Sequence, residues 1–276
     1  MTDGGPALGP RNTEVKRLRT LLRDPSARAA ESAFVLEGPR LVADALRRGA
    51  VFDAIFLGPN ARTAFRALLE IPRDDDVAVF DLKEGVLEKL GSTRTPQPVL
   101  AVAVIPRRPS VADLDGDGPV LVAVSVSDPG NLGTLVRGAE ASGCAGVVCC
   151  GESVDVYNPK VVRASAGSVL GIPIVERRGS GGAGEAGDPV LVLDELAALG
   201  RKRYGAAVGG APASTVDLSV PVALALGNEA HGLSDRVLEH VDGRISIPMA
   251  GQAESLNVAM AGTVLAFEAA RQRNAP

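Results

Sequence analysis

Three segments of the sequence combine polar side chains with loop-forming residues. They are DPGNLGTLVRG at 128–138, LALGNEAHGLS at 224–234 and ISIPMAGQAESLNVAMAG at 245–262. Each follows an apolar run that predicts a strand and precedes a segment that predicts a helix. Because loops at the carboxyl ends of strands build the ligand sites of α/β sheets, we expect the three segments to meet at one sheet edge. Their amide, carboxylate and guanidinium groups could orient a polar substrate there.

Each of these polar residues also fits a purely structural role. Asn131 and Ser255 are types that cap helix N-termini, and Gly227 begins a dipeptide typical of turns. Arg137 is harder to explain in this way, because it lies almost opposite the apolar stripe of its predicted helix. Glu229 directly follows an apolar strand, where a carboxylate needs a partner or exposure to a cleft. The stripe opposite the arginine consists of Leu132, Leu135, Val136 and Ala139.

The elements that must position these segments alternate between strand and helix along the chain. A stretch rich in Pro, Gly and Asp at 106–119 predicts a linker, and residues 1–12 predict a flexible tail. Residues 13–105 are then expected to form a small α/β/α domain, and residues 120–276 a second α/β domain. Small branched apolar residues and few aromatics suit such layers, in which parallel strands are buried on both faces.

The last predicted helix, 255–273, is apolar on nearly every face between Leu256 and Phe267. A helix that is apolar all round is buried all round. On the outside of a single sheet it would keep one polar face, so another loop of the chain or a second subunit must cover it. On this ground we predict a homodimer.

A glycine-rich stretch, GSGGAG at 179–184, matches the GxGxxG pattern of dinucleotide-binding proteins. That pattern binds a pyrophosphate only where a helix begins directly after it. Here Pro189 and an apolar run follow, and we expect no helix in that space. We therefore interpret 179–187 as a surface loop without an assigned role. A nucleotide-dependent oxidoreductase is disfavoured for the same reason.

Other features exclude further classes of protein. The spacing of Cys144, Cys149 and Cys150 fits neither a disulfide framework nor a zinc site, so we expect reduced core residues. The two histidines have no partner at metal-ligand spacing, and no metal is expected. The N-terminus does not read as a signal peptide, and no apolar run is long enough for a membrane helix. These patterns predict a soluble cytoplasmic protein.

The net charge is −4 and is unevenly distributed. Residues 1–110 contain 17 Lys and Arg against 14 Asp and Glu, whereas residues 111–276 contain 12 against 19. The net negative charge argues against nucleic acid as a partner, but the uneven distribution weakens that argument, and charge alone does not decide the question. The basic segment 11–30 fits either a nucleic-acid surface or an ordinary solvated helix face.

Taken together, the three segments resemble the SpoU/TrmH-type branch of the SPOUT RNA methyltransferases. Asn and Arg six residues apart, Gly-Asn-Glu after an apolar strand, and Ile-Pro-Met followed by Ser-Leu-Asn occur in the family's order. Residues 13–105 resemble the substrate-binding domain of many members, notably at FVLEGPRLVADAL, 34–46. The resemblance implies a C-terminal trefoil knot, a dimer, and methyl transfer from S-adenosylmethionine to a ribose 2′-hydroxyl of RNA.

The resemblance also implies roles for individual residues. Arg137 would activate the 2′-hydroxyl, with Asn131 and Glu229 orienting the arginine and the substrate. Ser255 and Asn257 would form the wall of the active site. Because a guanidinium stays protonated, Arg137 would bind the neighbouring phosphate and the hydroxyl while another group or the phosphate takes the proton. The implied cofactor-binding residues are Leu226, Gly227, Ile247, Met249 and Leu256.

The segment NPKVVRASAGS at 158–168 resembles the subgroup that acts on ribosomal RNA. 23S ribosomal RNA is therefore the expected substrate, with transfer RNA, or a catalytically silent RNA-binding relative, as the alternatives. Because the catalytic half is acidic, we expect the RNA contacts on the N-terminal domain, with binding that falls steeply as salt rises. The candidate RNA-binding residues are Arg17, Arg19 and Arg28 of that domain, together with Arg163 of the second domain.

Overall fold

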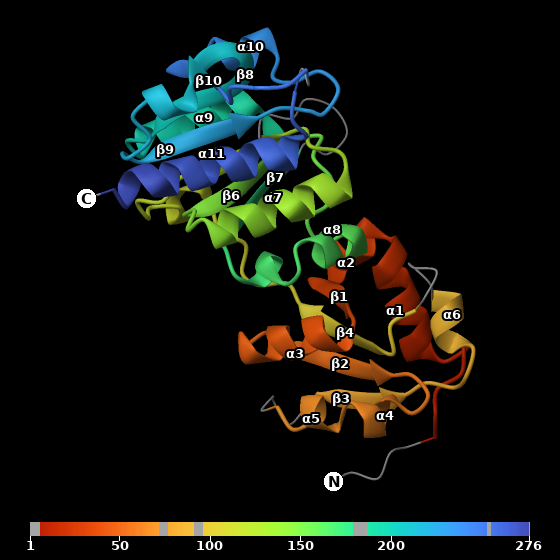
Figure 1. Cartoon of the computed structure of the whole chain (residues 1–276). Coiled ribbons are helices and arrows are strands. Elements are labelled where there is room, and N and C mark those ends of the chain that lie inside the picture. The colour runs from red at the N-terminus through yellow and green to blue at the C-terminus, as the bar shows by residue number, and fades with distance from the viewer. Residues whose placement is uncertain (1–5, 72–76, 91–95, 179–186, 253–254, 276) are drawn as a thin grey trace. The chain divides into compact units, whose positions relative to one another are not determined.

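The computed structural model describes residues 6–71, 77–90, 96–178, 187–252 and 255–275. The chain divides into two compact units, each with a sheet of its own. Unit 1 consists of residues up to Arg107 together with Tyr157–Leu170, and unit 2 consists of Arg108–Val156 and the residues from Gly171 onward. Figure 1 labels the elements of both units along the chain.

Unit 1 is built on a four-stranded mixed sheet in the order β1-β4-β2-β3. β4 is antiparallel to β1 and to β2, whereas β2 and β3 are parallel. Its strands are β1 (Ala33–Glu37), β2 (Phe52–Leu57), β3 (Ala78–Asp81) and β4 (Val99–Val104). Its helices are α1 (Thr13–Arg23), α2 (Pro25–Glu31), α3 (Pro39–Arg47), α4 (Ala61–Ala64), α5 (Arg66–Leu69), α6 (Val86–Leu90), α8 (Pro159–Ala164) and the 3-10 helix η2 (Ser168–Leu170).

Unit 2 is built on a six-stranded sheet in the order β10-β8-β9-β5-β6-β7, with every neighbouring pair parallel. The central strands β5 and β9 are buried at every residue, as the apolar runs predict. Its strands are β5 (Val120–Val124), β6 (Gly146–Gly151), β7 (Ile174–Arg178), β8 (Lys202–Pro212), β9 (Val222–Leu226) and β10 (Gly243–Ser246). Its helices are η1 (Val111–Asp113), α7 (Pro129–Ala141), α9 (Pro189–Ala198), η4 (Ala213–Thr215), α10 (Asp235–Leu238) and α11 (Val258–Arg273).

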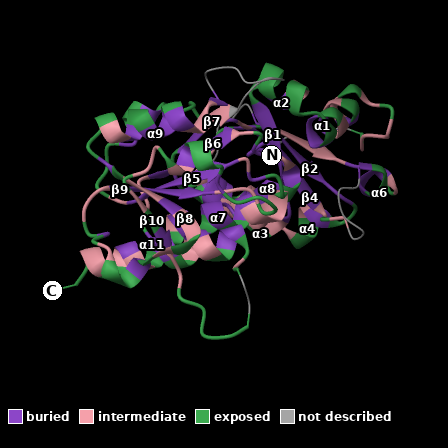
Figure 2. Ribbon diagram, turned by 90° about the horizontal axis from the view of Figure 1, so that it is seen from above, coloured by how far each residue is buried: buried purple, intermediate pink, exposed green. Residues whose placement is uncertain are grey.

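Helices cover both faces of the sheet of unit 2. α7 and α11 pack side by side across one face, and α9 lies on the other face, so that the buried strands lie between them (Figures 1 and 2). α7 and α11 approach closely at Gly138, where an added Cβ would lie 2.2 Å from Oγ1 of Thr263. A larger residue at position 138 would therefore separate the two helices.

The prediction that no helix follows the glycine-rich stretch is wrong. Residues 179–186 of that stretch lie outside the described residues, but α9 begins directly after them at Pro189. Asp188 caps this helix by accepting a hydrogen bond from the amide of Val190, and proline occupies the first turn. This arrangement is a standard helix start, which the apolar run after Pro189 obscured.

The predicted linker also differs from the structure. Unit 2 already begins at Arg108, and Val111 and Leu114 are buried in its core. The buried guanidinium of Arg201 anchors this segment by donating to the backbone carbonyls of Leu114 and Gly118, each at 2.7 Å. Residues 111–118 are thus an integral part of unit 2 rather than a connection.

The predicted second domain differs from unit 2 at one internal segment. Tyr157–Leu170, which carries α8, belongs to unit 1 although the flanking residues belong to unit 2. There the ring of Tyr157 packs against Phe34 of β1, with ring centroids 4.8 Å apart. Arg163 pairs with the buried carboxylate of Glu37 at 3.0 Å. Contacts between residues this far apart in the chain cannot be predicted from the order of elements along the sequence.

α11 is only partly as expected. Its inner face is buried, including Leu265 and Ala266, but an apolar stripe of Met260, Val264 and Phe267 is 45–56% exposed in the single chain. The helix is therefore not covered all round by its own chain. The trefoil knot implied by the resemblance stays a prediction.

The cysteines are free thiols, and Cys149 and Cys150 are buried in β6 as expected. Cys144 is only half-buried. Burial raises the pKa of the Cys150 thiol to about 12 and that of Cys144 to about 11, so both thiols are protonated at neutral pH. None of the helices in the described ranges has the length and hydropathy that a membrane crossing requires.

Candidate functional site

The candidate site lies at the carboxyl edge of the parallel sheet of unit 2. β5 and β9 are hydrogen-bonded neighbours in the sheet, with Ala123 opposite Leu226. The loops that follow these two strands therefore emerge side by side, one toward α7 and the other toward α10. This is the place where open α/β sheets bind their ligands.

Glu229 is the hub of the site. Its carboxylate accepts hydrogen bonds from the backbone amide of Asp128 at 3.1 Å and from the side-chain amide of Asn131 at 3.0 Å. Longer contacts of 3.4 Å come from the amide and hydroxyl of Ser127 and from the side chain of Asn228. Both carboxylate oxygens are thus used to hold the loop after β5 to the loop after β9.

The third segment joins this network through Asn257. Its side-chain amide donates to the Oδ1 of Asn131 at 2.6 Å, while its own Oδ1 accepts from the amide of Ala259 at 2.8 Å. Glu229, Asn131 and Asn257 therefore form one hydrogen-bonded chain. As the sequence predicts, the three polar segments meet at one sheet edge.

The residues that cap α7 and α11 are not Asn131 and Ser255, which the sequence suggests as caps. Asp128, not Asn131, caps α7, and it accepts a hydrogen bond from the amide of Asn131 at 2.8 Å. Asn257, not Ser255, caps α11, while Ser255 is exposed before the helix. Asn, Asp and Ser are nearly equivalent as caps, so residue type alone could not choose among them. Because Asp128 fills the cap, the side chain of Asn131 is available for Glu229.

The hydrogen bonds around Glu229 fix its ionisation. Burial raises the pKa of this carboxyl, but hydrogen bonds from the Asn131 side chain and from the backbone amides of Glu229 itself, Asp128 and Ser127 outweigh burial and lower the pKa below its ordinary value. A carboxylate with a lowered pKa and occupied lone pairs is a weak base. Its geometry suits holding the loops rather than accepting a proton.

Arg137 is placed differently from the other polar residues. It is exposed on α7, opposite the buried Leu132, Leu135 and Val136, as the helical wheel predicts. It lies six residues beyond Asn131, which is about 9 Å along a helix axis. Among the described residues it makes no hydrogen bond or ion pair, so Glu229 and Asn131 do not orient it in the single chain. Its guanidinium is open to a ligand.

The residues implied for the cofactor lie at the end of β9, directly after it, and after β10. Gly227 packs directly against the backbone of Gly232, where an added Cβ would lie 2.1 Å from the carbonyl carbon, so only glycine fits at this turn. Ile247 and Leu256 are half-buried apolar side chains, and Met249 is 37% exposed. Leu226 is buried, so it offers a ligand its backbone rather than its side chain. A tight glycine loop beside open apolar side chains fits an adenosine and an aliphatic arm.

Two residues of the site were missed in the sequence. The Gly-Asn pair suggests a turn, but the side-chain amide of Asn228 also donates to the carbonyl of Ser125 at 2.9 Å. Ser125 has a φ of 54°, a conformation that is uncommon outside glycine. Its carbonyl is aimed by this turn at the loop after β9, and no periodicity signals such a turn in advance.

Three of the four candidate RNA-binding arginines are engaged with other groups of the chain. Arg28 is 3% exposed and donates to the carbonyl of Leu21 at 2.6 Å, so its assignment to an RNA surface is wrong. Arg17 pairs with Glu31 at 2.6 Å and with Asp53 at 2.8 Å, which neutralises its charge. Arg19 stays available on α1, and Arg163 is engaged with Glu37. Within the described ranges, no group of three His, Cys, Asp or Glu side chains could hold a metal.

Comparison with known proteins agrees with this geometry. The pattern of the SpoU rRNA Methylase family matches residues 118–267, more than half of the chain, and that of the MRM3-like substrate binding domain matches residues 12–101. The chain belongs to the SpoU rRNA Methylase family. In that family it has the two-part form, with a substrate-binding domain before a methylase domain whose sheet is parallel.

Full-length relatives are known in this family. The chain is 34% identical to the 23S rRNA (guanosine(2553)-2'-O)-methyltransferase RlmP of Bacillus subtilis, with 93% of this chain and 96% of the relative covered. It is 31% identical to the 23S rRNA (uridine(2479)-2'-O)-methyltransferase of Streptomyces viridochromogenes, with 95% and 91% covered.

Solved structures match the chain over both units. The SpoU methyltransferase AviRb from Streptomyces viridochromogenes, in complex with the cofactor AdoMet, has a TM-score of 0.81 at 30% identity, with 95% of this chain and 98% of that chain covered. An AdoMet-bound rRNA methyltransferase from Sinorhizobium meliloti has a TM-score of 0.78 at 29% identity, with 96% of each chain covered.

Proposed function

We propose that this protein transfers a methyl group from S-adenosylmethionine to a ribose 2′-hydroxyl of 23S ribosomal RNA in the cytoplasm. The observation that carries the proposal is the hydrogen-bonded chain from Glu229 through Asn131 to Asn257, which gathers one polar residue from each of three segments. It lies at the sheet edge where α/β proteins bind ligands. The two relatives of similar length named above support 23S ribosomal RNA as the substrate.

S-adenosylmethionine, when bound, supplies an activated methyl group. Leu226 and Gly227 would hold it through their backbone, and Ile247, Met249 and Leu256 would contact its apolar parts. The network of Glu229, Asn131 and Asn257 keeps the loop after β9 and the start of α11 in fixed positions around that place. Fixed positions matter because an in-line methyl transfer depends mainly on orientation.

The attacking 2′-hydroxyl must lose its proton during the reaction. Glu229 is unsuited to accept it, because its pKa is lowered and its oxygens already accept hydrogen bonds. Arg137 would instead bind the phosphate beside the target ribose and donate to the 2′-hydroxyl. The positive charge lowers the pKa of the hydroxyl, and solvent takes the proton. Ser255 and Asn257 would form the wall beside the ribose.

The direct test is transfer of a labelled methyl group from S-adenosylmethionine to deproteinised RNA, followed by mapping of the modified ribose. Label at a 2′-oxygen of 23S rRNA is the expected result. Label in transfer RNA alone would replace ribosomal RNA as the substrate. No transfer to any RNA, with S-adenosylmethionine still bound, would favour a silent RNA-binding relative.

We infer that the protein is a homodimer formed through α11. Met260, Val264 and Phe267 lie at helical spacing on its outer face and are 45–56% exposed in the single chain. An apolar stripe of this kind on a helix is typical of a protein–protein interface. The neighbouring helix α7, which carries Arg137, packs against the same helix. The interface would thus lie beside the catalytic arginine.

Replacing Val264 and Phe267 together by glutamate is expected to give a monomer, because two charges would be buried in the interface. Light scattering after size-exclusion chromatography measures the mass of the parent protein and the variant. Leu191→Glu on α9 is the matched control, since Leu191 is also 43% exposed but lies on another helix. A parent protein that is monomeric, or a double variant that stays dimeric, would refute the assigned interface.

We also infer that α1 contributes to RNA binding. Lys16, Arg19 and Arg23 share the solvent face of this helix at positions i, i+3 and i+7, and among the described residues none of them has an ion-pair partner. Replacing all three by alanine is expected to weaken binding to 23S rRNA. It should also reduce the slope of log K against log salt by about two, because each phosphate contact contributes about 0.7 to 0.9 to that slope. Arg66→Ala is the control, because Arg66 is paired with Glu70 on α5. An unchanged slope in the triple variant would contradict this surface.

A further inference from the structure

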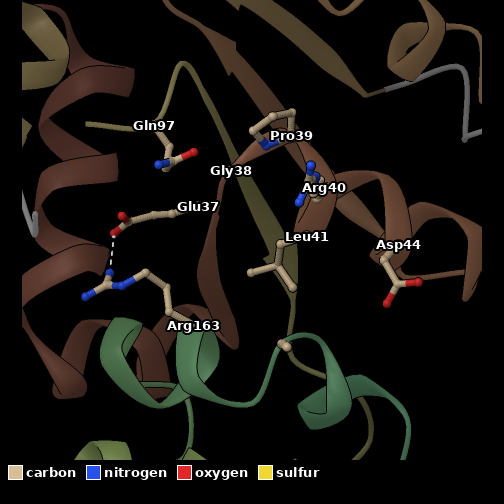
Figure 3. Close-up of a pocket in the computed structure, with 9 residues that line it drawn as sticks. Glu37, Gly38, Pro39, Arg40, Leu41, Asp44, Gln97 and Arg163 are labelled. Carbon is tan, nitrogen blue, oxygen red and sulfur yellow. Dashed lines mark hydrogen bonds and ion pairs between the residues drawn. The ribbon is translucent and has the colours of Figure 1, made fainter. Parts of the chain in front are cut away.

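A cavity of about 570 Å³ lies within unit 1. Its walls are the turn from β1 into α3, the residue Gln97 before β4, and the segment around α8 (Figure 3). This volume falls in the range of small-molecule sites, about 300–1,000 Å³. Of the candidate site residues named above, Arg163 alone lines this cavity, and it is paired with Glu37.

The charges at the cavity are largely compensated. Glu37 pairs with Arg163 at 3.0 Å, and Asp44 pairs with Arg48 at 2.9 Å. Arg40 is exposed at the start of α3 and, among the described residues, has no ion-pair or hydrogen-bond partner. The guanidinium of Arg40 is thus the one cation at the cavity without a partner among the described residues. It suits a ligand group with a single negative charge rather than a group with several charges, which would need several cations.

The remaining lining residues offer apolar surface and one uncharged polar group. Pro39, Leu41 and Ala166 provide the apolar part. Gln97 is exposed and lies over Gly38, where an added Cβ would be 3.4 Å from its Oε1. A side-chain amide both donates and accepts, so it can pair with the edge of a nucleobase.

We propose that the cavity holds one unstacked nucleotide of the RNA substrate. Its base packs on Pro39, Leu41 and Ala166, its hydrogen-bonding edge meets Gln97, and its phosphate meets Arg40. Proteins that read RNA by sequence bind bases that have left the helix in this way, on an apolar surface with a polar group at the base edge. The inference rests on RNA as the substrate, and it assigns unit 1 a part in selecting which RNA segment is bound.

The test compares three single variants of the full chain in filter binding to deproteinised 23S rRNA over a series of salt concentrations. Arg40→Ala and Gln97→Ala are expected to weaken binding about tenfold each, and only Arg40→Ala reduces the salt slope, by about one. Arg47→Ala is the matched control, since Arg47 is an exposed arginine of the same helix outside the cavity. All four proteins should have the same Tm, because the replaced side chains are exposed.

Ultraviolet cross-linking of the parent protein to the same RNA gives an independent readout. Cross-linked peptides that contain residues 37–44 or Gln97 support the proposal. Equal losses for Arg40→Ala and Arg47→Ala with no loss for Gln97→Ala, or cross-links that avoid these peptides, would overturn it. A parent protein that binds and cross-links through the cavity yet transfers no methyl group would contradict the proposed function and leave this inference intact.

Discussion

Arg137→Ala is expected to lower the rate of methyl transfer by at least about 100-fold while S-adenosylmethionine binding and the fold stay unchanged. The fold should tolerate the change because Arg137 is exposed and, among the described residues, makes no hydrogen bond or ion pair. The reaction should not, because no other cation is assigned to lower the pKa of the 2′-hydroxyl. Single-turnover rates, cofactor affinity by calorimetry and Tm separate these three effects.

Two further variants sharpen the assignment of Arg137. Thr134→Ala removes an exposed side chain one helical turn earlier and should be nearly silent. Arg137→Lys keeps the charge but loses the planar fork that binds phosphate and hydroxyl together, so it should recover only part of the rate. Near-normal turnover by Arg137→Ala would show that the proton is removed without this guanidinium.

Glu229→Gln is expected to lower methyl transfer by about 100-fold through misplacement of the loops, since small displacements at a reacting centre have effects of this size. The carboxylate accepts from Asp128, Asn131, Ser127 and Asn228, so every neighbour is a donor. A glutamine places an NH₂ group against one of these donors and leaves it unsatisfied. Steady-state kinetics should show the loss, with Glu239→Gln on the surface as the control.

The same variant tests the ionisation of Glu229. Because the folded-state pKa is lowered, the carboxylate adds stability above its unfolded value of 4.5 and loses that contribution as pH falls through the folded-state pKa. The difference in unfolding free energy between the parent protein and Glu229→Gln should therefore be largest near neutral pH and shrink below 4.5. Urea unfolding over this range measures it. A difference that is constant with pH would mean that the charge is not what holds the loops.

The positions of the site loops could be predicted because they depend on short-range patterns. The apolar runs that became β5 and β9 are buried at every residue, and the polar residues after them had to emerge at the sheet edge. The partners of those polar residues could not be predicted in the same way. Glu229 and Asn131 are 98 residues apart in the chain, and their contact depends on strand order.

Other predictions were wrong because the same sequence signal fits two different local structures. The run after Asp188 is apolar enough for a buried strand, and only the cap and the proline at its start indicate the helix that forms. On α1, the spacing of basic residues predicts a charged face, but it does not predict which of those arginines form ion pairs with residues of other elements. Arg17 turned toward Glu31 and Asp53, which come from other elements, whereas Arg19 did not.

The membership of Tyr157–Leu170 in unit 1 has a consequence for synthesis of the chain. A ribosome delivers residues from the N-terminus, so β5, α7 and β6 emerge before unit 1 has received α8. Until then, Glu37 lacks its ion pair with Arg163 and Phe34 lacks the ring of Tyr157. The two units must therefore mature in an interleaved order during translation, and a fragment that stops at Arg107 would be an incomplete folding unit.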